Sequence, residues 1–108
     1  MTVTIRELVD GVSGLEVVAG DDFMDRLISV ADVSRPSIEM TGYFNFYPAD
    51  RVQIFGRTEI SFAERMTSDE RKIIMKKMCT PETPCFVITR NLTPPEELIE
   101  VATEKGIP

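Results

Sequence analysis

Residues 85–89 read C-F-V-I-T, and this short apolar run does most to decide the fold. Pro81 and Pro84 exclude a helix just before it, because proline lacks the N–H that a helix needs. A brief run of Phe, Val and Ile between turns is typical of a strand buried on both faces of a parallel sheet. We therefore expect an interior strand here. Residues 52–55, V-Q-I-F, predict a second buried strand that closes at Gly56.

Capping signals predict helices on either side of these two strands. The pairs Thr4–Glu7 and Thr67–Glu70 have the spacing of a capping box, in which the hydroxyl and the carboxylate each accept a backbone N–H. They predict a short helix that ends near Gly11 and a longer one that runs to about Met78.

Two further helices are expected, one before and one after residues 85–89. Thr58 is expected to cap the first, whose apolar side would carry Ile60, Phe62, Ala63 and Met66. Pro94 and Pro95 suit the cap and first turn of the last helix, and Gly106 suits its C-terminal cap.

The helix after Thr67 has a mixed surface. We expect it to bury Ile74 and Met78. Its basic residues are interpreted as a solvated face: Arg71, Lys72, Lys76 and Lys77.

The remaining signals are shorter. Residues 15–19, L-E-V-V-A, lie between two glycines and predict a strand, and residues 26–30 predict another. Residues 38–46 predict a short helical segment broken at Gly42. This alternation of helices and strands indicates an α/β domain with a mixed or mainly parallel sheet and helices on both sides.

Length, charge and hydropathy argue against several classes of function. A chain of 108 residues is one domain by length, and a net charge of −6 argues against nonspecific binding of nucleic acid or of an anionic membrane. The longest apolar runs are a few residues, far short of the ~20 that a bilayer-spanning helix needs.

The two cysteines are interpreted as reduced, buried thiols of a cytosolic protein. Cys79 and Cys85 flank the sequence T-P-E-T-P, and a disulfide across this turn stays open as an alternative. A metal site is not expected, because the chain has no histidine and two thiols do not complete a tetrahedron.

Two proline-anchored blocks carry a resemblance to a known family. They are residues 34–47, S-R-P-S-I-E-M-T-G-Y-F-N-F-Y, and residues 79–95, C-T-P-E-T-P-C-F-V-I-T-R-N-L-T-P-P. Together with V-T-I-R-E-L-V and L-E-V-V-A-G near the start, they resemble the N-terminal domain of bacterial HPr kinase/phosphorylase over nearly the whole chain. Three residues depart from the family's usual Gly, Arg and Gly: Ser37, Thr80 and Asn91. Asn tolerates a left-handed backbone, so the last change is structurally mild.

The resemblance implies a noncatalytic domain over residues 1–108, with a fold similar to the N-terminal UDP-binding domain of Mur ligases. Enzymes of this family phosphorylate a serine of the phosphocarrier HPr with ATP or pyrophosphate and also remove that phosphate. They thereby control carbon catabolite repression through the phosphotransferase system in the cytoplasm. ATP and magnesium belong to a C-terminal domain with a G-x-x-x-x-G-K-[ST] loop, and no such motif occurs in this sequence.

The same resemblance implies an assembly. The whole enzyme would be a hexamer held largely by its C-terminal domains, so residues 1–108 alone are expected to be a monomer or weak dimer. The partners would be the enzyme's own C-terminal domain and, indirectly, HPr.

Three classes of function follow. The first is a regulatory or assembly domain of this kinase/phosphorylase. The second is a module that binds a small ligand, such as a nucleotide-sugar-like molecule or an anionic metabolite. The third, an independent enzyme, has no visible nucleophile–base pair or metal set to support it.

A candidate anion site follows from three arginines. We expect Arg35, Arg51 and Arg90 to gather at one sheet edge near the turn at Glu82 and Thr83. The planar guanidinium donates two parallel hydrogen bonds to a carboxylate or phosphate. The alternative is structural, with each arginine paired to an internal glutamate.

The block at residues 34–47 ends in an aromatic run. We expect its four members to pack in the core or between domains rather than to stack on bases: Tyr43, Phe44, Phe46 and Tyr47.

Overall fold

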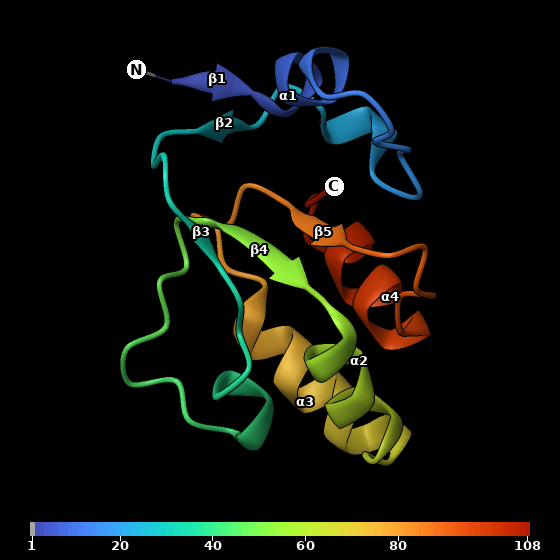
Figure 1. Ribbon diagram of the computed structural model, residues 1–108. Helices are drawn as coiled ribbons and strands as arrows, with labels where there is room; N and C mark the ends of the chain where they lie inside the picture. Colours follow the sequence, from blue (N-terminus) through green and yellow to red (C-terminus); the bar gives the residue numbers. More distant parts are fainter. Residues whose placement is uncertain (1) are drawn as a thin grey trace.

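The computed structural model describes residues 2–108 and is built around a parallel sheet (Figure 1). Its strands are β3 (Val33–Ser34), β4 (Val52–Phe55) and β5 (Phe86–Ile88), in the spatial order β3-β4-β5. The α/β fold with a parallel sheet is therefore confirmed. The central strand is β4, so the prediction that residues 85–89 form an interior strand is wrong. Its apolar residues predicted an interior strand, but β5 lies at the sheet edge and its side chains are only half-buried.

Side chains alternate along the strands and divide between two cores. Phe55 and Phe86 point to one face of the sheet, where their rings pack edge to face with centroids 5.9 Å apart. Val52 and Val87 point to the other face. Both faces of this sheet are therefore covered, as is usual for parallel strands.

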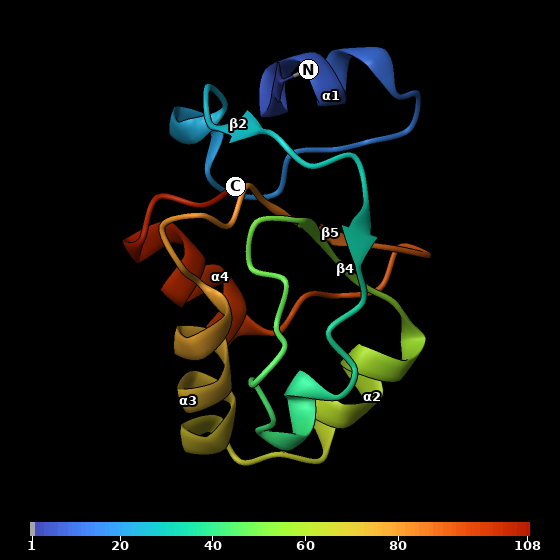
Figure 2. The same cartoon turned by 90° about the vertical axis from the view of Figure 1, so that its left-hand side faces the viewer.

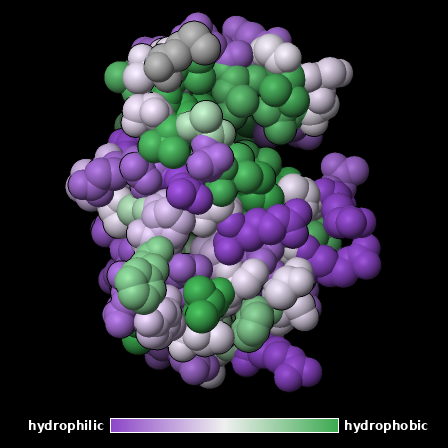
Figure 3. Space-filling view, turned by 60° about the vertical axis from the view of Figure 1, so that its left-hand side comes forward, coloured by the Kyte–Doolittle hydropathy of each residue, from purple (hydrophilic) through white to green (hydrophobic). Residues whose placement is uncertain are grey.

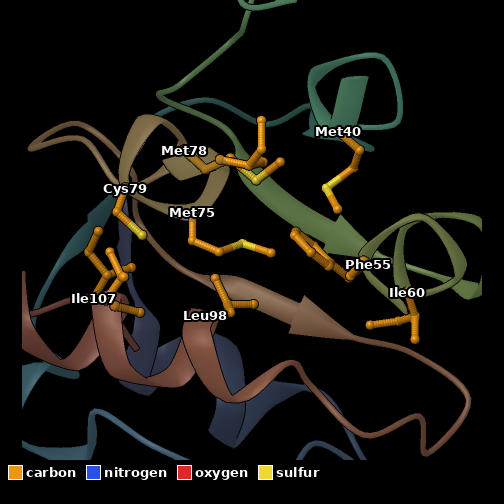
Figure 4. Packing of buried hydrophobic residues seen from close by; sticks show 12 residues of the cluster. Met40, Phe55, Ile60, Met75, Met78, Cys79, Leu98 and Ile107 are labelled. Carbon is orange, nitrogen blue, oxygen red and sulfur yellow. The ribbon is translucent and has the colours of Figure 1, made fainter. Parts of the chain in front are cut away.

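Helices α2 (Arg57–Glu64), α3 (Ser68–Met78) and α4 (Glu96–Glu104) cover the first face (Figures 1 and 2). Figure 4 shows their side chains meeting around Phe55. The main core is rich in methionine, which fills irregular gaps well. Its most deeply buried members are Phe55, Met40, Met75, Met78 and Ile107.

A smaller layer covers the second face. It consists of α1 (Ile5–Gly11) and an antiparallel pair, β1 (Val3–Thr4) with β2 (Leu27–Ile28). The smaller core comprises Ile5, Met24, Ile28, Val52 and Cys85. Helices thus lie on both sides of the sheet, as predicted. Figure 3 shows apolar side chains gathered over this upper layer.

Local signals located most helix ends correctly. The capping boxes Thr4–Glu7 and Thr67–Glu70 are both present, at the starts of α1 and α3. A one-turn helix, η2 (Glu39–Thr41), ends at Gly42, as predicted. A second short turn, η1 (Asp21–Phe23), precedes β2.

Three local predictions are wrong or too long. Residues 15–19 form no strand and belong to neither sheet of the described chain. The strand predicted at residues 26–30 is only two residues long, in β2. Thr58 does not cap α2, which begins one residue earlier after Gly56.

Arg71 is not on a solvated face. Its guanidinium donates to the Glu97 carboxylate (Nε–Oε1 2.8 Å) and to the carbonyls of Ala63 (2.9 Å) and Met66 (2.6 Å). Ser68 Oγ donates to the same carboxylate at 2.8 Å. The Arg71 hydrogen bonds hold the pKa of Glu97 down at about 2. This cluster joins α2, α3 and α4.

Both cysteines are free and buried, as predicted. Burial raises the pKa of the Cys79 thiol to about 11 and that of Cys85 to about 12. Both thiols therefore stay protonated at neutral pH. Across residues 2–108, no helix is long and apolar enough to cross a membrane.

Replacing Glu97 with glutamine should remove an acid-sensitive contribution to stability. The pKa of Glu97 is lowered in the folded protein, so its contribution is complete above its ordinary pKa of 4.5 and fades as pH falls toward 2. We expect Glu97→Gln to lower the free energy of unfolding at pH 7 by about 1–2 kcal/mol. The difference from the unmodified protein should shrink as the pH falls from 4.5 to 2, as measured by urea unfolding.

The matched control is Glu100→Gln on the same helix. Glu100 pairs with Lys72 at 3.3 Å, but both side chains are largely solvated. An exposed pair of this kind is worth about 0.2–1 kcal/mol. Equal losses in the two variants would contradict the special role of Glu97.

The two thiols should resist modification in the folded protein. We expect a chromogenic disulfide reagent at pH 7 to react with both at least about 100-fold more slowly than with a free thiol, because only the exposed thiolate is nucleophilic. In denaturing guanidinium both should react at once. Rapid reaction of one thiol in the native protein would contradict their burial.

Candidate functional site

The carboxyl ends of β3, β4 and β5 meet at one edge of the sheet, because the three strands are parallel. Arg35, Gly56 and Thr89 directly follow these strands. In open α/β sheets, ligands bind outside such an edge, usually where the strand order reverses. Here the strand order follows the chain order, so the edge has no reversal point. The candidate site is therefore a surface formed by the residues that follow the strands.

The buried carboxylate of Glu59 connects the segments that follow β3 and β4 at this edge. Its side chain, only 1% exposed, accepts the Gly56 N–H at the start of α2 (Oε1, 2.6 Å) and a hydrogen bond from Ser37 Oγ (Oε2). A carboxylate at this position complements the positive end of the helix dipole. Glu59 thus fills the place that a bound anion would take at this helix. Sequence reasoning missed this role, although the pair Gly56–Glu59 has capping-box spacing.

Arg35 lies directly over Gly56. A Cβ atom added at Gly56 would lie 3.2 Å from Arg35 Nη1, 3.4 Å from Glu59 Oε1 and 3.5 Å from Thr89 Oγ1. Glycine is therefore the residue that lets these groups approach the backbone closely. Thr89 Oγ1 donates to the Phe55 carbonyl at 3.3 Å, which ties the ends of β4 and β5 together.

Arg90 follows the same edge in an uncommon backbone conformation. Arg90 and Asn91 both have positive φ, 59° and 53°. The mild effect expected of Asn91 is therefore supported, since asparagine adopts this region readily. Arg90 is exposed, so this turn presents its side chain to solvent beside the ends of the strands.

The expected gathering of three arginines is wrong. Arg51 directly precedes β4, and Glu82 and Thr83 precede β5, so all three lie at the amino edge of the sheet. Arg35 and Arg90 lie at the carboxyl edge. Sequence position alone did not distinguish the start of a strand from its end. Whether any of the five residues binds a ligand stays a prediction.

The turn at Thr83 has a structural role at the amino edge. Thr83 Oγ1 donates to the Met78 carbonyl at 3.1 Å. Arg26, for which no local sequence signal predicts a role, donates to the carbonyls of Thr83 (Nε, 3.1 Å) and Pro81 (Nη2, 2.8 Å). These bonds fasten the layer that contains β2 to the turn before β5.

Internal glutamates do not neutralise the three candidate arginines. Among residues 2–108, the ion pairs join Arg6 to Asp25, Arg71 to Glu97 and Lys72 to Glu100. The guanidinium groups of Arg35, Arg51 and Arg90 form none in this part of the chain. They are therefore available to a charged partner.

The aromatic run divides between core and surface. Phe44 and Tyr47 pack against the main core, with their rings 5.3 Å apart, and Tyr47 donates to the Met78 carbonyl at 2.7 Å. Tyr43 is exposed, and Phe46 is 82% exposed. The expected core packing is therefore confirmed for two of the four.

The described residues also bear on metal chemistry. Within residues 2–108, no group of three or more histidine, cysteine or acidic side chains is arranged to hold a metal ion. Ser37 Oγ donates to the Glu59 carboxylate, whose other oxygen already accepts the Gly56 N–H. Guanidinium groups and backbone donors therefore dominate the chemistry of the carboxyl edge.

Comparison with known proteins agrees with the sequence resemblance. The family described as "HPr Serine kinase N terminus" matches residues 3–108. The chain is 54% identical over 107 residues to the HPr kinase/phosphorylase of Levilactobacillus brevis and 50% identical over 108 residues to that of Lacticaseibacillus casei. A third relative, from Limosilactobacillus reuteri, is 50% identical over 106 residues.

These alignments cover nearly all of this chain but a small part of each relative. They include 98–99% of the chain and 33–34% of the relatives, so the chain spans about one third of their length. The family match over residues 3–108 and the relatives' identity together show that the chain belongs to the HPr serine kinase N-terminal family.

Proposed function

We propose that the chain is a noncatalytic regulatory or assembly domain of a bifunctional HPr serine kinase/phosphorylase. The observation that carries this proposal is the family match over residues 3–108, combined with relatives named HPr kinase/phosphorylase that are about three times as long. The whole enzyme would control carbon catabolite repression in the cytoplasm by phosphorylating HPr and reversing that reaction.

The chemistry of the chain supports a role without catalysis. Phosphoryl transfer from ATP needs a phosphate-binding loop, a lysine and Mg²⁺ held near the phosphates. The sequence has no G-x-x-x-x-G-K motif, and Glu59 already fills the anion-binding end of α2. ATP and magnesium would therefore bind in the two thirds of the protein that lie outside this chain.

A second candidate is a small-ligand module at the carboxyl edge. Arg35 favours it, because its guanidinium lies over Gly56 without a carboxylate in ion-pair contact among the described residues. Arg90 is exposed at the neighbouring strand end. Two such groups at one edge suit an anionic metabolite.

Assembly would use a different surface. Tyr43 and Phe46 are exposed aromatic side chains on the connection between β3 and β4, with ring centroids 6.3 Å apart. Aromatic side chains are enriched at protein interfaces. They favour contact with the enzyme's own catalytic domain. The catalytic domains would supply most of the contacts that hold a hexamer together, whereas residues 1–108 alone would be a monomer or weak dimer.

The isolated chain should neither bind ATP nor phosphorylate HPr. The reason is the missing phosphate loop. Titration calorimetry with ATP and magnesium, followed by a phosphorylation assay with HPr, measures both activities, and the full-length enzyme is the positive control. Micromolar ATP binding by residues 1–108 would contradict the proposal.

Changes at the carboxyl edge should alter regulation in the full-length enzyme. We expect Arg35→Ala and Arg90→Ala to shift the half-maximal concentration of an anionic effector, tested first with inorganic phosphate, by about 5-fold or more. The melting temperature should hardly change, because both side chains are exposed.

Two matched controls separate this site from a general loss of charge. Arg65→Ala removes an exposed arginine at the end of α2, and Arg51→Ala removes a half-buried arginine at the amino edge. Both controls should leave the effector response unchanged. An unaltered response in both Arg35→Ala and Arg90→Ala would count against the ligand site but not against the assembly role.

A further inference from the structure

A third arginine belongs to the carboxyl edge of the sheet. Arg57 is the second residue after β4 and the first of α2, and it is exposed. The Cα–Cβ bonds of a helix tilt toward its N-terminus, which for α2 lies at this edge. Arg35 directly follows β3, and Arg90 is the second residue after β5. Each of the three parallel strands is therefore followed by one arginine at the same edge.

The spacing of the strands sets the distance over which these arginines are spread. Neighbouring strands of a sheet lie about 4.8 Å apart, so the ends of β3 and β5, with β4 between them, are about 10 Å apart. A segment of about three extended residues has the same length. One short extended segment therefore matches the whole edge.

The backbone at this edge is held in place. Arg35 Nη1 lies close over Gly56, at 3.2 Å from the position of an added Cβ atom. Arg90 has a φ of 59°, which is uncommon for arginine, but the preceding Thr89 is tied to β4. Its N–H and Oγ1 donate to the Phe55 carbonyl at 3.0 and 3.3 Å. The two arginines therefore start from fixed positions, which lowers the entropy lost on binding.

Several other basic side chains are occupied inside the domain. Ion pairs or hydrogen bonds to carbonyls engage Arg6, Arg26, Arg71, Lys72 and Lys105. By contrast, Arg35, Arg57 and Arg90 form no ion pair among residues 2–108. The chain has 18 acidic and 12 basic residues, so its net charge repels an acidic partner. Three unpaired arginines at one edge reverse this effect locally.

The exposure of these side chains favours a partner larger than a metabolite. Sites for small molecules usually enclose most of the ligand. Two hollows in the described chain have volumes of about 340 and 400 Å³, and both are lined by residues other than the three arginines. Arg35, Arg57 and Arg90 are exposed instead, where their planar guanidinium groups can pair with successive carboxylates of an extended segment.

We propose that the carboxyl edge docks an extended acidic segment of a partner protein, with Arg35, Arg57 and Arg90 each pairing with a carboxylate. The inference rests on the regulatory or assembly role proposed above and names the kind of partner that this edge takes. Two parallel hydrogen bonds to each carboxylate give the contact direction as well as charge. Because the pairs stay solvated, each contributes little and the contact is reversible.

Titration of residues 1–108 with an octa-glutamate peptide, followed by NMR, tests the proposal. The amide resonances of Arg57, Thr89 and Arg90 should shift as the peptide is added. The dissociation constant should rise about 5-fold or more when salt is raised from about 50 to about 300 mM, because exposed pairs are screened. Absence of shifts at this edge, or equal shifts with the matching glutamine peptide, would overturn the proposal.

Charge reversal gives a second readout. Arg57→Glu should weaken peptide binding by about 5-fold or more. The fold should be retained, because a glutamate in the first turn of a helix is favourable. The matched control is Arg65→Glu, the same change at an exposed residue about 12 Å farther along α2. Equal weakening in the two variants would contradict a site at the carboxyl edge.

The outcomes separate this inference from the proposed function, because the titration needs no regulatory response. If the peptide does not bind while Arg35→Ala alters the phosphate response of the full-length enzyme, the edge takes a small anion and the acidic-partner proposal is overturned. If the peptide binds as expected while that response is unchanged, the docking surface stands and the small-ligand candidate fails.

Discussion

The burial of β4 on both faces is the constraint on which the rest of the structure depends. Phe55 is fully enclosed on one side and Val52 on the other, so each face requires its own cover. Three helices supply one cover, and the layer of α1, β1 and β2 supplies the other. The one polar residue of the strand is only half satisfied: the fully buried Gln53 donates from Nε2 to the carbonyls of Pro48 (2.8 Å) and Arg51 (3.0 Å), whereas its Oε1 has no hydrogen-bond partner among residues 2–108.

This arrangement explains where a ligand could meet the domain. The connections from β3 to β4 and from β4 to β5 pass over one face, so the strand order of this sheet never reverses. What remains at that edge is Arg35 over Gly56, with Glu59 buried beneath. An internal carboxylate that neutralises the helix end leaves an exposed guanidinium as the group able to meet an anion.

Partly buried charged groups of the domain act mainly by joining elements that are distant in the sequence. Arg71 and Glu97 join three helices, and Arg26 fastens the smaller layer to the turn before β5. Each guanidinium satisfies two or more acceptors at once, which compensates for removing the charge from water. The net charge of −6 is thus borne mostly by solvated carboxylates, whereas two of the arginines are structural.

By itself, the sequence determined the features that depend on neighbours a few residues apart. The capping boxes at Thr4 and Thr67, the strand at β4 and the stop at Gly42 follow from local hydrogen bonding and backbone sterics, and each was predicted. Only the tertiary structure decided which strand is central, that residues 15–19 have no ladder partner, and that Arg71 meets Glu97 from a different helix. It also decided that Arg51 and Arg35 lie at opposite edges of the sheet, because strand direction and the pairing of distant segments are set by packing across the whole domain, which local residue preferences do not encode.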